Sequence, residues 1–389
     1  MFEKPLGMRD TLPELYETKA AVRNKMSDEI KKWGYQFIET PALEYYETIG
    51  EASAILDQQL FKLLDQQGHT LVLRPDMTTP IARVAASKLL NQRIPLRLAY
   101  SANVYRAQQR EGGRPAEFEQ MGIECIGNKS TSADAEMIAL MADVLKAAGL
   151  EKFKITIGHI GFVQELFLSI LGNEERAAVL RKFLYEKNYV GYREHVKSLT
   201  LSSIDKQRLI EFISLRGGEN TLTKALGLLE GEHGREQLSE LQELAVQLKE
   251  FGVDQYVSLD LTLVSHMSYY TGTLFEVYAG GVGSPIGNGG RYDNLLDKFG
   301  WDASATGFGI RMDRLVEAIG EIQEADVPEC ILFSPERRKE ALDFAKQKRA
   351  EGIMVTIQDI NAVENVDAYT RTFSDVHLFV GNGGRVSNE

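Results

Sequence analysis

Apolar side chains recur at helical spacing near the start of the chain. A helix is predicted at 19–33, because Val22, Met26 and Ile30 stand four positions apart among charges there, with Ala20 before them. Gly34 ends this helix, and β-favouring residues at 35–38 predict a short strand after it. Further on, the pattern predicts strands at 70–73, 96–106, 117–126 and 152–157, and helices at 79–90 and 134–148.

The second half of the chain opens with a long helical pattern at about 161–250, which interrupts the strands. After it, the pattern predicts strands at 256–263 and 273–279, a glycine-rich turn at 280–290, a helix at 291–299 and a strand-to-helix unit at 306–319. Runs of strands with few crossover helices favour an antiparallel or mixed sheet, and hence the α+β class. Three regions are therefore expected: a core from 1–160 and 251–326, a helical insertion at 161–250, and a small α/β unit at 327–389.

The composition is that of an ordinary globular protein, with 43% hydrophobic and 26% charged residues. No apolar run approaches the roughly 20 residues of a membrane span, and the start carries no apolar signal segment. Cys125 and Cys330 lie far apart in the sequence, which favours a reduced, cytoplasmic setting. The net charge of −12 weighs against nucleic acid as a main partner. The six histidines show no zinc-binding spacing, so no metal is expected.

Asp76 and Thr78 follow a predicted strand end and precede a predicted helix. Asp and Thr are favoured at a helix N-terminus, so capping is the favoured interpretation of this pair. The alternative is that the carboxylate and the hydroxyl bind the ammonium group of a ligand.

Alternate residues of the strand predicted at 117–126 share one face of a sheet: Phe118, Gln120, Gly122 and Glu124. They form either a solvated sheet face or the floor of a polar pocket. A buried Glu124 would be costly without a partner, and a cationic or hydrogen-donating ligand would supply one. The glycines at 280–290 match no phosphate-binding fingerprint. The residues thus predict a pocket for a small cationic or zwitterionic ligand.

Several segments resemble, in their order, the catalytic core of histidyl-tRNA synthetases, a class II synthetase family. They are 34–44 (first motif), 104–106 with 113–118 (second), 306–315 (third), and the two histidyl segments 269–272 and 289–293. The resemblance covers about 1–320 and implies an antiparallel sheet flanked by helices, in a homodimer. It further implies that six residues bind histidine: Asp76, Thr78 and Gln120 its ammonium group, Glu124 and Tyr270 its imidazole, with Tyr269 alongside. Arg106 and Arg314 would be remnants of a phosphate or ATP site.

Three departures argue against aminoacylation. The family has Arg-Gly-Leu-Asp where this chain has Ser265-His266-Met267-Ser268, and loss of that arginine removes a charge worth several kcal/mol to the activation barrier. Gln108 replaces the glutamate that reads adenine. Only 63 residues follow Asp326, and this tail carries eight Lys and Arg against ten Asp and Glu, a poor surface for RNA.

A synthetase-like chain that keeps the histidine pocket and loses this arginine is similar to the regulatory subunits of short-form ATP phosphoribosyltransferases. The resemblance implies a non-catalytic subunit, without cofactor or metal, that acts in the first step of histidine biosynthesis. Its partners would be the short catalytic subunit and L-histidine as effector, within a hetero-oligomer that contains its homodimer, without tRNA or membrane. Two alternatives stay open: an active, divergent histidyl-tRNA synthetase with Arg311 or Arg291 as substitute cation, and a regulator of another pathway.

Overall fold

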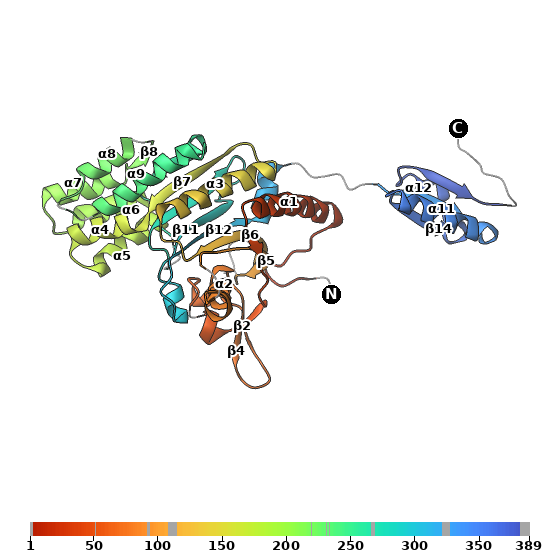
Figure 1. Cartoon of the computed structure of the whole chain (residues 1–389), viewed down its shortest axis with the longest axis horizontal. Helices are drawn as coiled ribbons and strands as arrows, with labels where there is room; N and C mark the ends of the chain where they lie inside the picture. Colours follow the sequence, from red (N-terminus) through yellow and green to blue (C-terminus); the bar gives the residue numbers. More distant parts are fainter. Residues whose placement is uncertain are drawn as a thin grey trace. The chain divides into compact units, whose positions relative to one another are not determined.

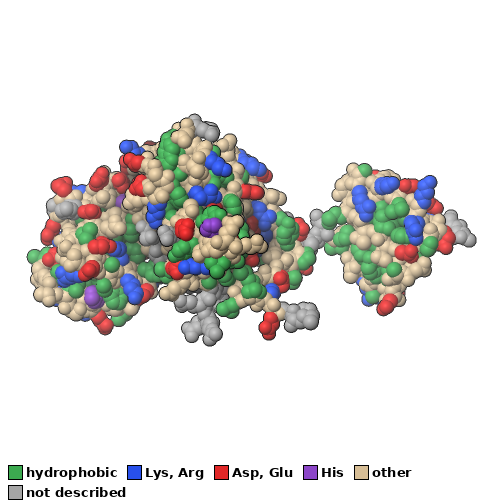
Figure 2. Space-filling view, turned by 90° about the horizontal axis from the view of Figure 1, so that it is seen from below, with side chains coloured by type: hydrophobic (Ala, Val, Ile, Leu, Met, Phe, Trp, Pro, Cys, Tyr) green, Lys and Arg blue, Asp and Glu red, His purple; other side chains and the backbone are tan. Residues whose placement is uncertain are grey.

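The computed structural model describes nine stretches of the chain: 3–50, 52–91, 94–107, 115–218, 220–230, 232, 234–265, 269–320 and 327–381. The chain forms two compact units, 1–322 and 323–389 (Figure 1). On the face drawn in Figure 2, acidic and basic side chains are interspersed on each unit. Within the described stretches, no helix is both long enough and apolar enough to cross a membrane.

The larger unit is built on a nine-stranded sheet with the order β1-β5-β6-β12-β11-β10-β7-β9-β8. The strands are β1 Gln36–Phe37, β5 Leu96–Tyr105, β6 Glu117–Ile126, β7 Phe153–His159, β8 Arg216–Gly217, β9 Val257–Asp260, β10 Thr273–Ala279, β11 Gly287–Arg291 and β12 Ala305–Arg311. Most neighbours run antiparallel, but β1 pairs with β5 and β7 pairs with β9 in parallel. The expected α+β fold with a synthetase-like sheet is confirmed, with a mixed rather than purely antiparallel sheet.

Some helices cover the sheet, and others form a helical segment at one side of it. They are α1 Pro13–Lys32, α2 Thr78–Val84, α3 Thr131–Ala147, α4 Ile160–Leu171, α5 Glu174–Tyr185, α6 Tyr189–Ser198, α7 Ser203–Phe212, α8 Asn220–Gly227, α9 Arg235–Glu250 and α10 Met312–Ile319. Helices α1 and α3 lie against each other across one face of the sheet (Figure 1). Helices α4 to α9 form the helical segment expected at 161–250, and they belong to the same compact unit as the sheet.

The core lies where the apolar positions of the strands meet these helices. On β6, the residues Met121, Ile123 and Cys125 are fully buried. They alternate with Gln120, Gly122 and Glu124, which therefore point to the opposite face of the sheet. A separate sheet, ordered β2-β4-β3, lies before α2 and consists of β2 Leu43–Tyr45, β3 Lys62–Leu64 and β4 Thr70–Leu73.

The helix predicted at 291–299 is wrong. Strand β11 ends at Arg291, and only a single helical turn, Leu296–Phe299, follows. Glycine is a poor strand former, so the sequence there favours a turn. In the fold, pairing with β10 and β12 outweighs this preference. A side chain at Gly289 would overlap the ring of Phe275, so the glycine lets β11 pack closely against its neighbour.

The smaller unit contains three parallel strands, ordered β14-β13-β15. Its elements are β13 Glu329–Phe333, α11 Arg338–Ala350, β14 Val355–Asp359, α12 Val366–Thr370 and β15 Val376–Phe379. Its small core consists of Ile331, Phe333, Ala341, Ala345 and Phe379. The alternation of strands and helices is that of an α/β unit.

Candidate functional site

One row of residues crosses seven strands on the face opposite α1 and α3. Cross-strand pairing places its members side by side in the order Tyr100, Gly122, Gly309, Asn288, Glu276, Thr156 and Ser258. Paired residues of neighbouring strands point to the same face. The next pairs along β6 and β12 are Gln120 with Arg311 and Glu124 with Gly307. Sheet register therefore gathers polar side chains around a strip of glycines.

The glycines of this strip make room for the polar groups beside them. A side chain at Gly309 would overlap the amide of Gln120, and one at Gly307 would overlap the carboxylate of Glu124. At Gly122, an added Cβ would lie 2.5 Å from the hydroxyl of Tyr100. Any larger residue at these positions would fill the space above the sheet.

Glu124 lies at the bottom of this space and is 1% exposed. Thr78 Oγ1 donates to its Oε1 at 2.8 Å, and the hydroxyl of Tyr292 donates to its Oε2. Burial, with a smaller contribution from the nearby Asp76 carboxylate, raises the pKa of Glu124 to about 8 against the lowering effect of the two hydrogen bonds. The carboxyl group is therefore mostly protonated at neutral pH, and a hydrogen-donating ligand would favour its charged form.

Asp76 is buried at the start of α2. Its Oδ1 accepts a hydrogen bond from the backbone N–H of Thr79 at 2.9 Å, so the capping interpretation of Asp76 is confirmed. Its Oδ2 accepts from Ser53 Oγ at 2.6 Å. The same carboxylate also lines the cavity described below.

Two further groups shape the site. The Oε1 atom of Gln120 is buried, and no hydrogen-bond partner for it occurs among the described residues. Tyr269 and Tyr270 pack edge to face at 4.9 Å between ring centroids, and Asn288 Nδ2 donates to the Tyr270 hydroxyl at 3.2 Å. A buried amide oxygen without a partner is costly, so a donor from a ligand would be favourable here.

All these groups line one cavity of about 40 Å³. Six of its lining residues are those that the sequence predicted for histidine: Asp76, Thr78, Gln120, Glu124, Tyr269 and Tyr270. The sequence did not predict the contributions of Tyr100, Asn288 and Tyr292, nor the role of the glycines. A cavity of this size holds only a few water molecules. An amino acid bound there must move a lining side chain or extend into a neighbouring space.

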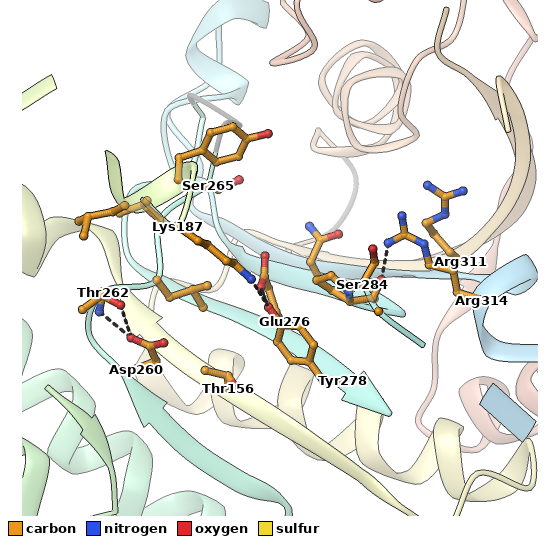
Figure 3. A pocket seen from close by; sticks show the side chains of 18 of the residues that line it. Thr156, Lys187, Asp260, Thr262, Ser265, Glu276, Tyr278, Ser284, Arg311 and Arg314 are labelled. Carbon is orange, nitrogen blue, oxygen red and sulfur yellow. Dashed lines mark hydrogen bonds between the residues drawn. The ribbon is translucent and has the colours of Figure 1, made fainter. Parts of the chain in front are cut away.

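Such a space adjoins it, a cavity of about 680 Å³ drawn in Figure 3. The two cavities share four lining residues: Arg106, Phe118, Asn288 and Arg311. In the larger one, Lys187 reaches toward Tyr278 and Glu276 on one side, and Arg311 and Arg314 lie on the other (Figure 3).

The larger cavity is lined by more basic than acidic side chains. Basic residues on its wall are Arg106, Lys187, Arg216, Arg311 and Arg314, against the acidic Asp260 and Glu276. Arg314 donates to the carbonyl of Pro285. Arg106 donates through Nε to the carbonyl of Pro75 at 2.8 Å, and burial lowers its pKa. Arg106 thus borders both cavities, whereas Arg314 borders only the larger one.

Ser265 lies on the wall of the larger cavity, at the position where the family signature has an arginine. Of the two substitute cations considered, Arg291 is excluded by its position. Its guanidinium forms a buried ion pair with Asp134 of α3 at 2.9 Å, and it lines neither cavity. Arg311 lines both. Gln108, Gly113-Arg114 and His266-Met267-Ser268 lie outside the described residues.

Within the described residues, one group has atoms close enough to share a metal ion: Glu329, Asp375 and His377, within 4.8 Å of one another. They come from the ends of β13 and β15, which are far apart in sequence. Lys348 Nζ lies 3.0 Å from Glu329 Oε2, and His377 Nε2 lies 2.8 Å from the same atom. An ammonium group at this distance competes with a metal cation for the carboxylate, so these residues form an ion-pair network.

Comparison with known proteins places the chain among relatives over nearly its full length. A family model of histidyl-tRNA synthetase matches residues 7–315, and a model described as the C-terminal domain of histidyl-tRNA synthetase HisZ matches 330–381. The ATP phosphoribosyltransferase regulatory subunit of Geobacillus thermodenitrificans is 63% identical over 384 residues, which cover 99% of this chain and 98% of the relative. That of Bacillus subtilis is 59% identical over 381 residues, which cover 98% and 97%.

Solved structures agree with these matches. A crystal structure of an ATP phosphoribosyltransferase regulatory subunit/histidyl-tRNA synthetase from Bacillus halodurans is similar with a TM-score of 0.93 and 58% identity, covering 98% of this chain and 99% of that one. A histidyl-tRNA synthetase from Nostoc shares the fold, with a TM-score of 0.81 and 21% identity, covering 98% and 92%. The chain therefore belongs to the family of ATP phosphoribosyltransferase regulatory subunits, which have a histidyl-tRNA synthetase-like fold.

Proposed function

We propose that this regulatory subunit binds L-histidine in the smaller cavity and conveys feedback inhibition to the catalytic subunit of a short-form ATP phosphoribosyltransferase. The observation that carries the proposal is the set of six residues assigned to histidine from the sequence, all of which line one cavity. Histidine is the end product of the pathway that this enzyme would start, so its binding here would report the supply of product.

The chemistry of the cavity suits histidine. Glu124 would accept a hydrogen bond from the imidazole N–H, next to the ring of Tyr270. Asp76 and the Oε1 of Gln120, which has no partner in the described part of the chain, would accept hydrogen bonds from the ammonium group. The contact with Gln120 would supply a donor to a buried acceptor that has none among the described residues, which removes a desolvation cost that the ligand-free site carries.

The alternative function is aminoacylation, which needs a cation where the histidine carboxylate attacks ATP. Ser265 carries no charge, Arg291 is paired with Asp134, and the guanidinium of Arg311 is paired with Asp313. The net charge of −12 also argues against a tRNA surface, and the face drawn in Figure 2 shows acidic and basic side chains interspersed. Histidine- and ATP-dependent exchange of pyrophosphate separates the two functions, because only an active synthetase forms the adenylate.

Regulation further requires a partner. We infer that the chain forms a homodimer within a hetero-oligomer with the short catalytic subunit, which depends on it for activity. Histidine must then bind one state of the complex more tightly than another, and any change that it makes in the affinity for a substrate is matched by an equal change in its own affinity when that substrate binds.

The proposal is tested with the purified full-length chain and the co-expressed catalytic subunit. Titration calorimetry should detect histidine binding to this chain alone, and the mixture should show ATP phosphoribosyltransferase turnover that histidine inhibits. Histidine-dependent pyrophosphate exchange, or turnover that is indifferent to this chain, would overturn the proposal.

A further inference from the structure

Arg311 stands at the junction of the two cavities in a fixed orientation. Its guanidinium carbon lies 3.7 Å from the centroid of the Phe118 ring, a close stacking distance. Its Nε and Nη2 donate to the carboxylate of Asp313 at 3.2 and 2.8 Å. Stacking and a two-point hydrogen bond together hold the planar group in place. No hydrogen bond from its Nη1 occurs among the described residues, so this donor remains available.

Glu124 and Arg311 lie at different positions along the smaller cavity. Acidic groups of Asp76 and Glu124 line it together with the guanidinium groups of Arg106 and Arg311. Arg311 pairs across the strands with Gln120, whereas Glu124 pairs with Gly307, four residues away along each strand. Glu124 and Arg311 are thus about 13 Å apart along the backbone, at about 3.3 Å per residue. The imidazole assigned to Glu124 and a carboxylate at Arg311 would therefore lie at opposite ends of one ligand.

The basic end has two arginines, but they are placed differently. Arg106 is already directed by its hydrogen bond to the carbonyl of Pro75, and the Asp76 carboxylate is its nearby counter-charge. Both arginines border the larger cavity, into which a ligand too large for 40 Å³ must extend. Of the two, Arg311 pairs across the strands with Gln120, the residue assigned to the ammonium group, so the carboxylate of the same amino acid would lie beside Arg311.

We propose that Arg311 binds the α-carboxylate of the amino acid and so makes the site selective for amino acids over the corresponding amines. This inference rests on the proposed histidine site and names the group that would hold the ligand's carboxylate, which Ser265 cannot do as a cation. Asp313 acts as a positioning residue, because it holds the guanidinium in the plane that a carboxylate needs. Phe118 supports the other face of the same group.

The test compares histidine with histamine, which has the same imidazole and ammonium group and lacks the carboxylate. Titration calorimetry on the full-length chain should show wild type preferring histidine by about 30-fold or more, the effect of one buried charge pair. In Arg311→Gln this preference should shrink toward equality, through weaker histidine binding with histamine binding unchanged. Arg311→Lys should recover part of the preference, because it keeps the charge and loses the planar fork.

Arg216→Gln is the matched control. Arg216 also lines the larger cavity, so its loss removes the same charge from that space without touching the smaller cavity. Arg216→Gln should bind both probes as wild type does.

Unchanged histidine binding by Arg311→Gln would overturn this inference and leave the proposed function standing. If wild type binds neither probe, the proposed function itself is wrong and the inference falls with it. Histamine binding by Arg311→Gln shows that the variant is folded.

Discussion

Arg291 of β11 and Asp134 of α3 form a buried ion pair, with Nε 2.9 Å from Oδ2 and side chains only 9% and 5% exposed. Arg291 also donates to the carbonyls of Asn128 and Ser130, just before the helix begins. One side chain thus joins the start of α3 to the middle of the sheet. Within the histidyl segment 289–293, Arg291 therefore serves to hold the fold together and does not contact the ligand site.

Arg291→Met should lower the free energy of unfolding by about 3–5 kcal/mol, because it leaves the Asp134 carboxylate buried without its partner. Urea unfolding followed by circular dichroism measures this change. Lys146→Met is the control: its ion pair with Asp143 is exposed and should be worth less than about 1 kcal/mol. Equal effects of the two variants would show that Arg291 does not clamp the helix.

Gly309→Ala should abolish histidine binding. The new methyl group would overlap the amide of Gln120 and approach the Tyr100 hydroxyl at 3.0 Å, both of them side chains that border the cavity. Gly280→Ala is the matched control, since no atom lies within 4 Å of a methyl group there. Calorimetry with histidine should find binding only in the control and in wild type. Undiminished affinity in Gly309→Ala would place the ligand elsewhere.

Glu124 should make the stability of the wild type depend on pH. Its pKa is 4.5 when unfolded and about 8 when folded, so the folded state holds a proton that the unfolded state releases between these values. The free energy of unfolding should therefore fall as the pH rises through this window, relative to Glu124→Gln, which does not titrate. Denaturation of both proteins at matched pH gives the difference directly. A constant difference would show that Glu124 titrates normally in the folded protein.

His159 should anchor the helical segment to the sheet. Its Nδ1 accepts from the N–H of Phe162 at the start of α4, and its Nε2 lies 2.9 Å from Glu240 of α9. His159→Ala loses both contacts and should cost about 1–3 kcal/mol in unfolding free energy. His159→Asn keeps an effective capping group and should cost less. Thermal or urea unfolding ranks the two variants, and the reverse order would rule out the capping role.

The sequence was sufficient for the fold class through the pattern and order of its elements. It was sufficient for the six residues that line the cavity through strand alternation, for Gln120 and Glu124, together with the family resemblance. Gly307 and Gly309 could not be assigned from the sequence, since their role follows from the register of β12 against β6. The same holds for Tyr100 and Asn288, which cross-strand pairing brings to the site. Arg291 was wrong as a substitute cation because its partner, Asp134, lies 157 residues away in the chain.

The row from Tyr100 to Ser258 has a consequence for how a signal could leave the site. Each residue of the row lies in a strand that pairs with the next strand of the row. Local bending of the sheet beneath the cavity would therefore disturb backbone hydrogen bonds in several strands at once. This part of the sheet therefore forms a rigid surface under the ligand. A bound ligand would displace the elements around it, which include α2, Tyr269 and Tyr270, and a conformational change that reaches a partner would begin with them.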